Sequence, residues 1–186
     1  MKSASIKDHK NLLKVFMILL NYGVIRKGDV TAWADSVLAD EDESEYAFIE
    51  LSTSDNVHDT IQILKKNSTD ADPEITSRAV LGILYHILQD EKVFLKTVFE
   101  IATYISYEEK LTTDEQFLLY RFDEHIEFNL NDVYERLRLF KANFMDLLTI
   151  YKLFTLENHD HWPAINEKTL LDLDMRLEVV KNNYPY

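Results

Sequence analysis

Apolar residues at alternating intervals of four and three dominate the stretch that follows Asn131. The residues of this repeat are Val133, Leu137, Phe140, Phe144, Leu147 and Tyr151. Side chains at this spacing fall on one side of an α-helix, and the pattern is typical of a buried seam in a helical bundle. Helical spacing of apolar residues recurs through most of the chain, so the sequence predicts about eight helices and no strand.

Glycine and proline are scarce in this sequence. The 186 residues include three of each, whereas average usage would give roughly thirteen glycines and nine prolines. Because sheets draw on these residues for tight turns, their scarcity favours helices joined by short polar loops. We therefore expect an all-α fold, an irregular multi-helix bundle in a single domain over residues 1–186. Stacked helical hairpins are an alternative arrangement, and the loop-like stretch 67–73 is a candidate subdivision.

Several helix ends are marked by residues that cap helices. Gly23 is placed to end a first helix over roughly Ile6–Tyr22. Asp72–Pro73–Glu74 combines a capping side chain with a proline at the first helical position. Thr112, followed by Glu115 three residues later, fits a capping box. These signals predict where three of the helices begin or end.

The stretch from Gly28 to Thr60 contains ten carboxylates and neither lysine nor arginine. The preceding stretch, Met1–Lys27, carries six basic residues against a single acid, Asp8. The whole chain has a net charge of −13. A surface this acidic repels phosphate backbones and anionic lipids, so we expect neither a nucleic acid nor a membrane as partner. A basic protein is the expected partner.

Two interpretations of the acidic stretch remain open. In the first, it is a solvated surface on short helices, or it is neutralised by lysines of the basic first helix. In the second, the carboxylates attract a basic protein, and an aromatic side chain supplies apolar contact. The residues expected to bind such a partner are Asp35, Asp40, Glu41, Asp42, Glu43, Glu45, Tyr46 and Glu50.

No catalytic signature occurs in the sequence. It contains no cysteine, no Gly-x-Ser-x-Gly, no phosphate-binding glycine loop and no His-Glu-x-x-His. His159–Asp160–His161 offers imidazole and carboxylate groups to a transition metal, and His159 and His161 are the candidate ligands. A polar loop closed by Pro163, which we expect to break the chain, explains the same residues. We expect no catalytic residue and no cofactor, and we keep a metal-dependent or carboxylate-based enzyme as an alternative.

The sequence also bears on location and assembly. The absence of cysteine fits the cytoplasm, and no run approaches the ~18 apolar residues that a membrane span needs. We therefore expect a cytoplasmic protein. A further alternative is a structural or oligomerising helical protein, in which the Val133–Tyr151 seam forms a contact between molecules. The oligomeric state is left open.

One pair of segments resembles a known group of proteins. Trp33–Ala34–Asp35 is followed, across the acidic connector, by Phe48–Ile49–Glu50–Leu51–Ser52. In this order the segments resemble small acidic all-helical bacterial proteins of uncharacterised function, some of which are similar to the immunity proteins of polymorphic or contact-dependent toxins. The resemblance covers mainly residues 10–65, and it implies no catalysis and a single protein partner. The preferred hypothesis is a non-enzymatic protein-binding module, and its sharpest version is an immunity protein that neutralises a basic toxin by occluding the active surface of that toxin.

Overall fold

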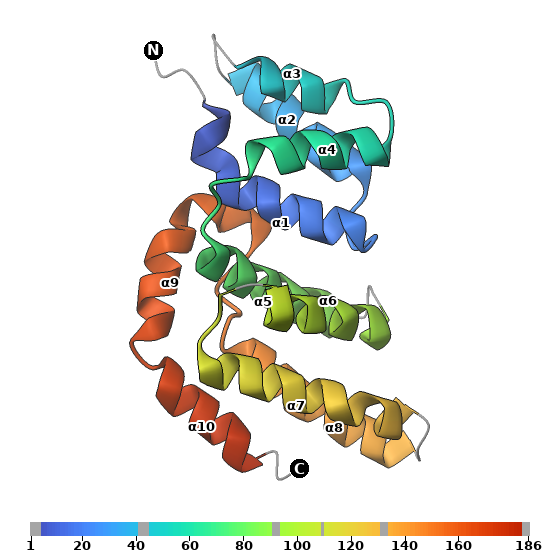
Figure 1. Ribbon diagram of the computed structural model, residues 1–186, viewed down its shortest axis with the longest axis vertical. Coiled ribbons are helices and arrows are strands. Elements are labelled where there is room, and N and C mark those ends of the chain that lie inside the picture. Colours follow the sequence, from blue (N-terminus) through green and yellow to red (C-terminus); the bar gives the residue numbers. More distant parts are fainter. Residues whose placement is uncertain (1–4, 41–44, 91–93, 109, 131–133, 184–186) are drawn as a thin grey trace. The chain divides into compact units, whose positions relative to one another are not determined.

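The computed structural model describes residues 5–40, 45–90, 94–108, 110–130 and 134–183, and the side chains of residues 108 and 123–137 lie outside that description. Within the described residues the chain is all-α, as predicted (Figure 1). This part contains ten α-helices and two short 3-10 helices, which is more than the expected eight or so. The chain divides into two compact units, Met1–Asp72 and Pro73–Tyr186, and this division falls within the stretch 67–73.

The first unit is built from a 3-10 turn and four α-helices. The turn η1 (Ile6–His9) leads into α1 (Lys10–Asn21), and the elements that follow are α2 (Lys27–Asp40), α3 (Tyr46–Ser52) and α4 (Val57–Asn67). Helix α1 packs against α4, while α2 and α3 pack against each other and α3 also contacts α4. The chain therefore forms two helix pairs that share one core.

Apolar and aromatic side chains fill the core of the first unit. Helix α1 buries a wide stripe composed of Leu12, Leu13, Val15, Phe16, Ile18, Leu19 and Leu20. Phe48 and Leu51 of α3 are fully buried. The ring of Trp33 lies 5.5 Å from that of Phe16 and 5.8 Å from that of Phe48, measured between centroids. This aromatic contact connects α1, α2 and α3.

The ends of these helices follow the capping signals in the sequence. Gly23 has a φ of 68°, and its N–H donates to the carbonyl of Leu20 (3.1 Å), which ends α1. Asn56 caps α4 by accepting from the N–H of Asp59 (3.0 Å). At the end of the unit, the N–H of Asp72 donates to Asn11 Oδ1 of α1 (2.8 Å).

The second unit contains six α-helices and one 3-10 helix. In chain order they are α5 (Pro73–Gln89), α6 (Leu95–Glu108), α7 (Thr113–Leu130), α8 (Tyr134–Thr149), η2 (Leu156–His161), α9 (Trp162–Leu170) and α10 (Leu173–Asn183). Helix α5 contacts α6, α8 and α9. Helix α7 contacts α6 and α8, and α10 contacts α7, α8 and α9. Helix α5 thus packs against three other helices of this unit, and it begins at the proline that the sequence marked.

The described part of the predicted seam is buried inside this unit. Phe140, Phe144 and Leu147 of α8 are at most 3% exposed. The ring of Phe99 in α6 stacks on those of Phe140 and Phe144 at centroid distances of 5.1 and 4.1 Å. These residues are therefore covered by α6 and its neighbours within one molecule, and they are not available for a contact between molecules. Val133 lies outside the described residues.

Two sites show how backbone chemistry shapes the second unit. A Cβ atom on Gly82 of α5 would lie 2.3 Å from the carbonyl oxygen of Tyr151 and 2.8 Å from Cβ of Phe154, so only glycine permits this close approach.

Pro163 does not break the chain as predicted. It lies in the first turn of α9, where a backbone N–H has no partner within the helix and its loss costs nothing. This helix accounts for part of the difference in helix number.

Candidate binding surface

The outward side of α3 combines an aromatic, an aliphatic and an acidic residue. Successive side chains of an α-helix point about 100° apart, so Tyr46, Ile49 and Glu50 point away from the buried Phe48 and Leu51. Tyr46 is 71% exposed and Ile49 is 42% exposed. Large side chains with this exposure offer apolar area to a partner. Together with the flanking acids Asp35, Asp40 and Glu45, these three residues are called the α3 surface below.

Neutral hydroxyl groups hold two of the flanking carboxylates. Ser52 at the end of α3 donates to Asp35 of α2, and Ser5 donates to Glu45 just before α3 (2.7 Å). A hydroxyl fixes the position of a carboxylate but leaves its negative charge in place. The two acids therefore lie in defined positions beside α3, and each accepts a hydrogen bond from a neutral donor.

Cations do not pair with the acids of the α3 surface in the described part of the chain. No lysine or arginine among the described residues forms an ion pair with Asp35, Asp40, Glu45 or Glu50. Asp40 is also the last residue of α2, whose final turn contains no basic residue. An acid at a helix C-terminus is electrostatically unfavourable, so this position does not stabilise the unit. Of the predicted binding residues, Glu41, Asp42 and Glu43 lie outside the described residues.

Two other acids of the stretch, Asp29 and Asp59, lie at helix starts. Asp29, in the first turn of α2, accepts a hydrogen bond from the backbone N–H of Arg26 (2.7 Å). Asp59, in the first turn of α4, accepts from the side-chain amide of Asn56 (2.6 Å). These two carboxylates therefore form hydrogen bonds at the helix starts, unlike those of the α3 surface.

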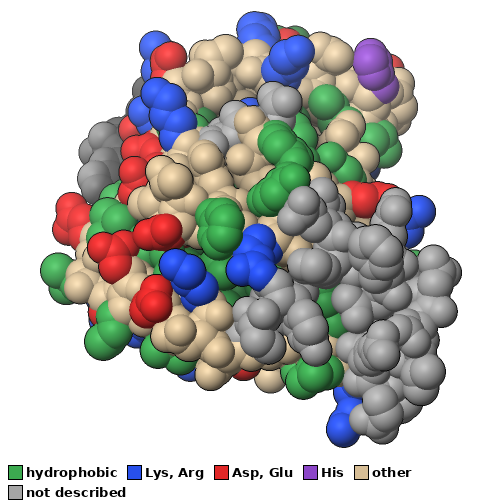
Figure 2. Space-filling model, turned by 60° about the horizontal axis from the view of Figure 1, so that its bottom comes forward, with side chains coloured by type: hydrophobic (Ala, Val, Ile, Leu, Met, Phe, Trp, Pro, Cys, Tyr) green, Lys and Arg blue, Asp and Glu red, His purple; other side chains and the backbone are tan. Residues whose placement is uncertain are grey.

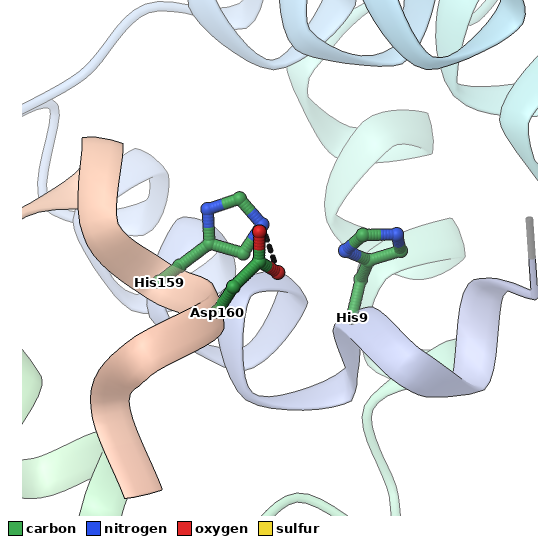
Figure 3. A group of neighbouring side chains, drawn as sticks. All are labelled: His9, His159 and Asp160. Atoms are coloured by element: carbon green, nitrogen blue, oxygen red, sulfur yellow. Dashed lines mark ion pairs between the residues drawn. The ribbon is translucent and has the colours of Figure 1, made fainter. Parts of the chain in front are cut away.

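The histidine segment differs from the loop that the sequence predicted. His159 and Asp160 belong to the 3-10 helix η2, and Thr155 and Asn158 form a capping box at its start. His159 Nε2 lies 3.3 Å from Asp160 Oδ1, the pair that the dashed line in Figure 3 joins, and its Nδ1 is 3.1 Å from the carbonyl oxygen of Leu156. His161 is exposed at the end of η2.

This segment provides few ligands for a metal. Within the described residues of the second unit, no third histidine or carboxylate converges with His159 and Asp160; His9, also labelled in Figure 3, belongs to the first unit. Zinc sites use three or four protein ligands. The described part of the second unit therefore does not bring His159 and His161 together with enough further groups to form such a site.

A buried ionic network lies at the centre of the second unit. Arg78 of α5 binds Glu115 of α7 through two parallel hydrogen bonds, Nε to Oε1 (2.9 Å) and Nη2 to Oε2 (3.0 Å). Its Nη1 donates to Asn166 Oδ1 of α9 (2.7 Å) and pairs with Glu74. The hydroxyl of Tyr151 donates to Glu115 Oε1 (2.9 Å). The network thereby connects α5, α7, α9 and the segment after α8.

Glu115 has a second role at the start of α7. Its backbone N–H donates to Thr112 Oγ1 (3.3 Å), and its Oε2 accepts from the N–H of Thr112 (2.8 Å). These two bonds form the predicted capping box. The carboxylate therefore receives a guanidinium, a phenol and a backbone N–H, which together replace the water that it loses on burial.

The pKa values of the network residues reflect this balance. Burial by itself raises the pKa of Glu115, but the hydrogen bonds and charge of Arg78 outweigh burial, so the pKa of this carboxyl is lowered. Burial also acts to lower the pKa of Arg78, and Glu115 reverses that effect and raises it. Burial and the charge of Glu115 raise the pKa of Tyr151 well above its ordinary value. All three groups therefore keep their usual protonation states at neutral pH.

The centre of the network, Arg78 and Glu115, joins helices of the second unit and is closed to a ligand. The side chains of Arg78 and Glu115 have no exposed area, and both oxygens of Glu115 are occupied. Sequence reasoning did not single out Arg78. The available signal was a glutamate four residues before an arginine within an otherwise apolar helix, Glu74 and Arg78 of α5. A lone arginine in such a helix predicts a buried partner from another helix.

Comparison with protein-family models, with curated proteins and with solved structures gave no match. None of the described helices is both long enough and apolar enough to cross a membrane. The function must therefore be inferred from the surface itself.

Proposed function

We propose that the α3 surface is a docking site for a basic protein and that the chain acts as a non-enzymatic binding module in the cytoplasm. The single observation that carries this proposal is the exposed Tyr46 of α3, with Glu45 next to it and Glu50 one turn along the helix, where neither carboxylate forms an ion pair within the described chain. Aromatic residues surrounded by polar groups are frequent hot spots of protein interfaces. Uncompensated charge speeds the encounter with a partner of opposite charge.

The proposed mechanism is occlusion of the partner. Tyr46 and Ile49 would enter an apolar depression of the partner, while Glu45 and Glu50 meet its basic side chains. A stable complex buries about 1,200–2,000 Å² in total, which is more than α3 offers alone, so neighbouring parts of α2 would contribute. In the sharpest form of the proposal the partner is a basic toxin domain, and its active surface is covered. This form rests on the resemblance of Trp33–Asp35 and Phe48–Ser52 to immunity proteins.

The first experiment tests whether the α3 surface selects a partner. The affinity-tagged chain is expressed in the cells that encode it, and proteins that co-purify are identified by mass spectrometry. Tyr46→Ala should lose the partner. Tyr107→Ala is the matched control, because Tyr107 of α6 is similarly exposed (64%) but lies in the second unit. Equal recovery of the partner by both variants contradicts the proposal.

The second experiment tests the role of charge with the purified partner. The association rate of the wild-type chain should fall steeply as salt is raised to about 0.5 M, because salt screens exposed charges. Glu45→Gln/Glu50→Gln should lower the rate at low salt, whereas Glu157→Gln/Glu167→Gln, which removes two exposed acids of the second unit, should not. An association rate that salt leaves unchanged would overturn the electrostatic mechanism.

A third experiment addresses toxin neutralisation. The partner is expressed alone, with the wild-type chain, and with the Tyr46→Ala variant. If the partner is a toxin, growth should stop in the first culture, continue in the second and stop again in the third. Growth of the first culture would remove the toxin from the proposal but leave the docking surface, which the first two experiments test separately.

A further inference from the structure

Helix α10 is apolar on two sides. Leu173, Leu177 and Val180 point into the second unit and are at most 5% exposed. On another side of the helix, Met175 is 65% exposed and Val179 is 54% exposed. These two residues are four apart, so they lie one above the other on the helix surface. A last helix with one buried and one exposed apolar side has packed only part of its apolar area.

The exposed side of α10 forms one wall of a groove, and α8 forms the other. The groove has a volume of about 430 Å³ and lies between Asp146 and Ile150 on one side and Met175 and Val179 on the other. Its rim carries one charge from each helix, Asp146 on α8 and Arg176 on α10. Figure 2 brings this end of the second unit forward and shows hydrophobic side chains among acidic and basic ones.

We propose that this groove is a dimer interface and that its occupant is a second copy of the chain. The walls of the groove are two packed helices, α8 and α10. Two such pairs that face each other complete a four-helix bundle, which is a common solution for helices with one uncovered apolar side. A two-fold axis through the groove would bring α8 of each copy over α10 of the other, so that both copies cover Met175 and Val179 at once.

The charges on the rim favour a second copy over an unrelated partner. One wall carries an acid and the other a base, so the groove is complementary to itself. After a two-fold rotation, Asp146 of each copy faces Arg176 of the other, and both contacts form together. Arg176 already binds Asp172 through Nε (2.8 Å) and Nη2 (2.7 Å). A guanidinium has five N–H donors, so it can bind a second carboxylate without losing the first.

The size of the interface predicts a reversible dimer. Stable dimers bury about 800 Å² on each partner, whereas this groove is lined by parts of only two helices and the residue that follows α8, so the contact is small. We therefore expect a monomer at low concentration and a dimer at high concentration. This interface lies in the second unit and does not include the α3 surface, so it goes beyond the proposed function and does not depend on it.

The first test uses sedimentation velocity of the full chain over a wide range of concentrations. Val179→Glu should raise the dissociation constant of the dimer about tenfold or more, because it places a charge in an apolar contact. Val57→Glu is the matched control. It makes the same substitution at a residue of similar exposure (45%) in the first turn of α4, and it should leave the dissociation constant unchanged. Circular dichroism confirms that both variants are folded.

The second test exchanges the charges of the rim and identifies the occupant directly. Asp146→Arg leaves two bases on the rim and Arg176→Asp leaves two acids, so neither variant should self-associate. A mixture of the two should form a heterodimer, because both cross-contacts then join opposite charges. The double variant Asp146→Arg/Arg176→Asp should form a homodimer again. Only a contact between two copies across a two-fold axis predicts this set of results.

Several outcomes would overturn the inference. A wild-type chain that stays monomeric at every concentration excludes a second copy and leaves the groove to another partner. A dimer that Val179→Glu does not weaken must use a different surface. Single charge variants that are folded but do not associate when mixed exclude the two-fold arrangement.

Discussion

The two units of this protein use carboxylates in opposite ways. In the first unit, Glu45 is exposed just before α3 and Glu50 is half-buried within it, and the core beneath them is aromatic and aliphatic. In the second unit, Glu115 is fully buried and receives Arg78, Tyr151 and a backbone N–H. A buried carboxylate must be fully bonded, because an unpaired buried charge is very costly. An exposed carboxylate has no such requirement, and it is available for function.

This comparison can be tested by measuring each unit separately. The chain has two tryptophans, Trp33 in the first unit and Trp162 in the second. Incorporation of fluorotryptophan therefore provides one fluorine NMR signal for each unit without any substitution. Urea titrations followed by the two signals give a free energy of unfolding for each unit, and these are the measurements used below.

The largest effect is expected from Arg78→Met. This substitution leaves Glu115 buried without its guanidinium, and the loss of one partner of a buried ion pair costs about 3–5 kcal/mol. The Trp162 signal should report this loss. Lys65→Met is the control, because Lys65 is exposed at the end of α4, and it should change stability by less than about 0.5 kcal/mol. An equally stable Arg78→Met variant would show that the network does not hold the second unit together.

Phe48→Ala tests the core of the first unit, and we expect a loss of stability similar to that of Arg78→Met. Phe48 is fully buried, and the removal of such a side chain costs about 3–5 kcal/mol. The Trp33 signal should shift to lower urea concentration. Phe94→Ala, at a residue that is 85% exposed, should have an effect below about 0.5 kcal/mol. A small effect at Phe48 would mean that the aromatic core is not what stabilises this unit.

Gly82→Ala tests the close approach of α5 to the segment after α8. The added Cβ would lie 2.3 Å from the carbonyl oxygen of Tyr151, and forcing extra atoms into a packed core costs about 1–3 kcal/mol. Gly28→Ala provides a control of opposite sign. Nothing lies within 4 Å of that site in α2, so alanine should stabilise the first unit by about 0.4–1 kcal/mol. Destabilisation by both substitutions would contradict the proposed cause.

Tyr151→Phe removes one hydrogen bond from Glu115 and should cost the second unit about 1–3 kcal/mol at neutral pH. The substitution should also change how the free energy of unfolding of the second unit depends on pH at alkaline pH. The pKa of Tyr151 is higher in the folded state than in the unfolded state. The protonated hydroxyl therefore stabilises the second unit fully below the unfolded pKa of about 10, and this stabilisation is lost as pH rises above it. The wild type should therefore lose more stability than the variant between neutral pH and pH of about 11. If the free energies of unfolding of the wild type and the variant fall equally over this pH range, the proton of Tyr151 does not stabilise the second unit in this way.

Asn56→Ala should have the smallest effect. Asn56 accepts from the N–H of Asp59 at the start of α4, and the loss of such a cap costs about 1 kcal/mol. The Trp33 signal should report it. Asn21→Ala, at an exposed residue that ends α1, should change stability by less than about 0.5 kcal/mol. Equal effects at both positions would mean that the cap contributes nothing specific.

Local signals in the sequence were sufficient for much of the fold. The all-α class, the end of α1 at Gly23, the start of α5 at Pro73 and the capping box of Thr112 and Glu115 were all predicted, because each depends on residues close together in the chain. The helix η2 was missed because its capping box uses Asn158 where glutamate or glutamine is the usual signal.

Distant contacts could not be derived in this way. Arg78 binds a glutamate 37 residues away and an asparagine 88 residues away, and helical spacing says nothing about which helices become neighbours. The groove was missed for a similar reason. Helical spacing places Met175 and Val179 on another side of α10 than Leu173 and Leu177, but it does not show that α8 lies beside them and forms a groove. The binding role of Asp35, Asp40, Glu45, Tyr46 and Glu50 stays a prediction.

The hydrogen bond between Asp72 and Asn11 has a practical consequence for anyone who divides the gene. A fragment that stops at residue 71 loses this bond, whereas one that stops at residue 72 keeps the tail fastened to the start of α1. The complementary fragment should not begin at Pro73. A new charged amine there would lie at the positive end of the α5 dipole and oppose it, so an acetylated start or a short neutral leader is the better choice.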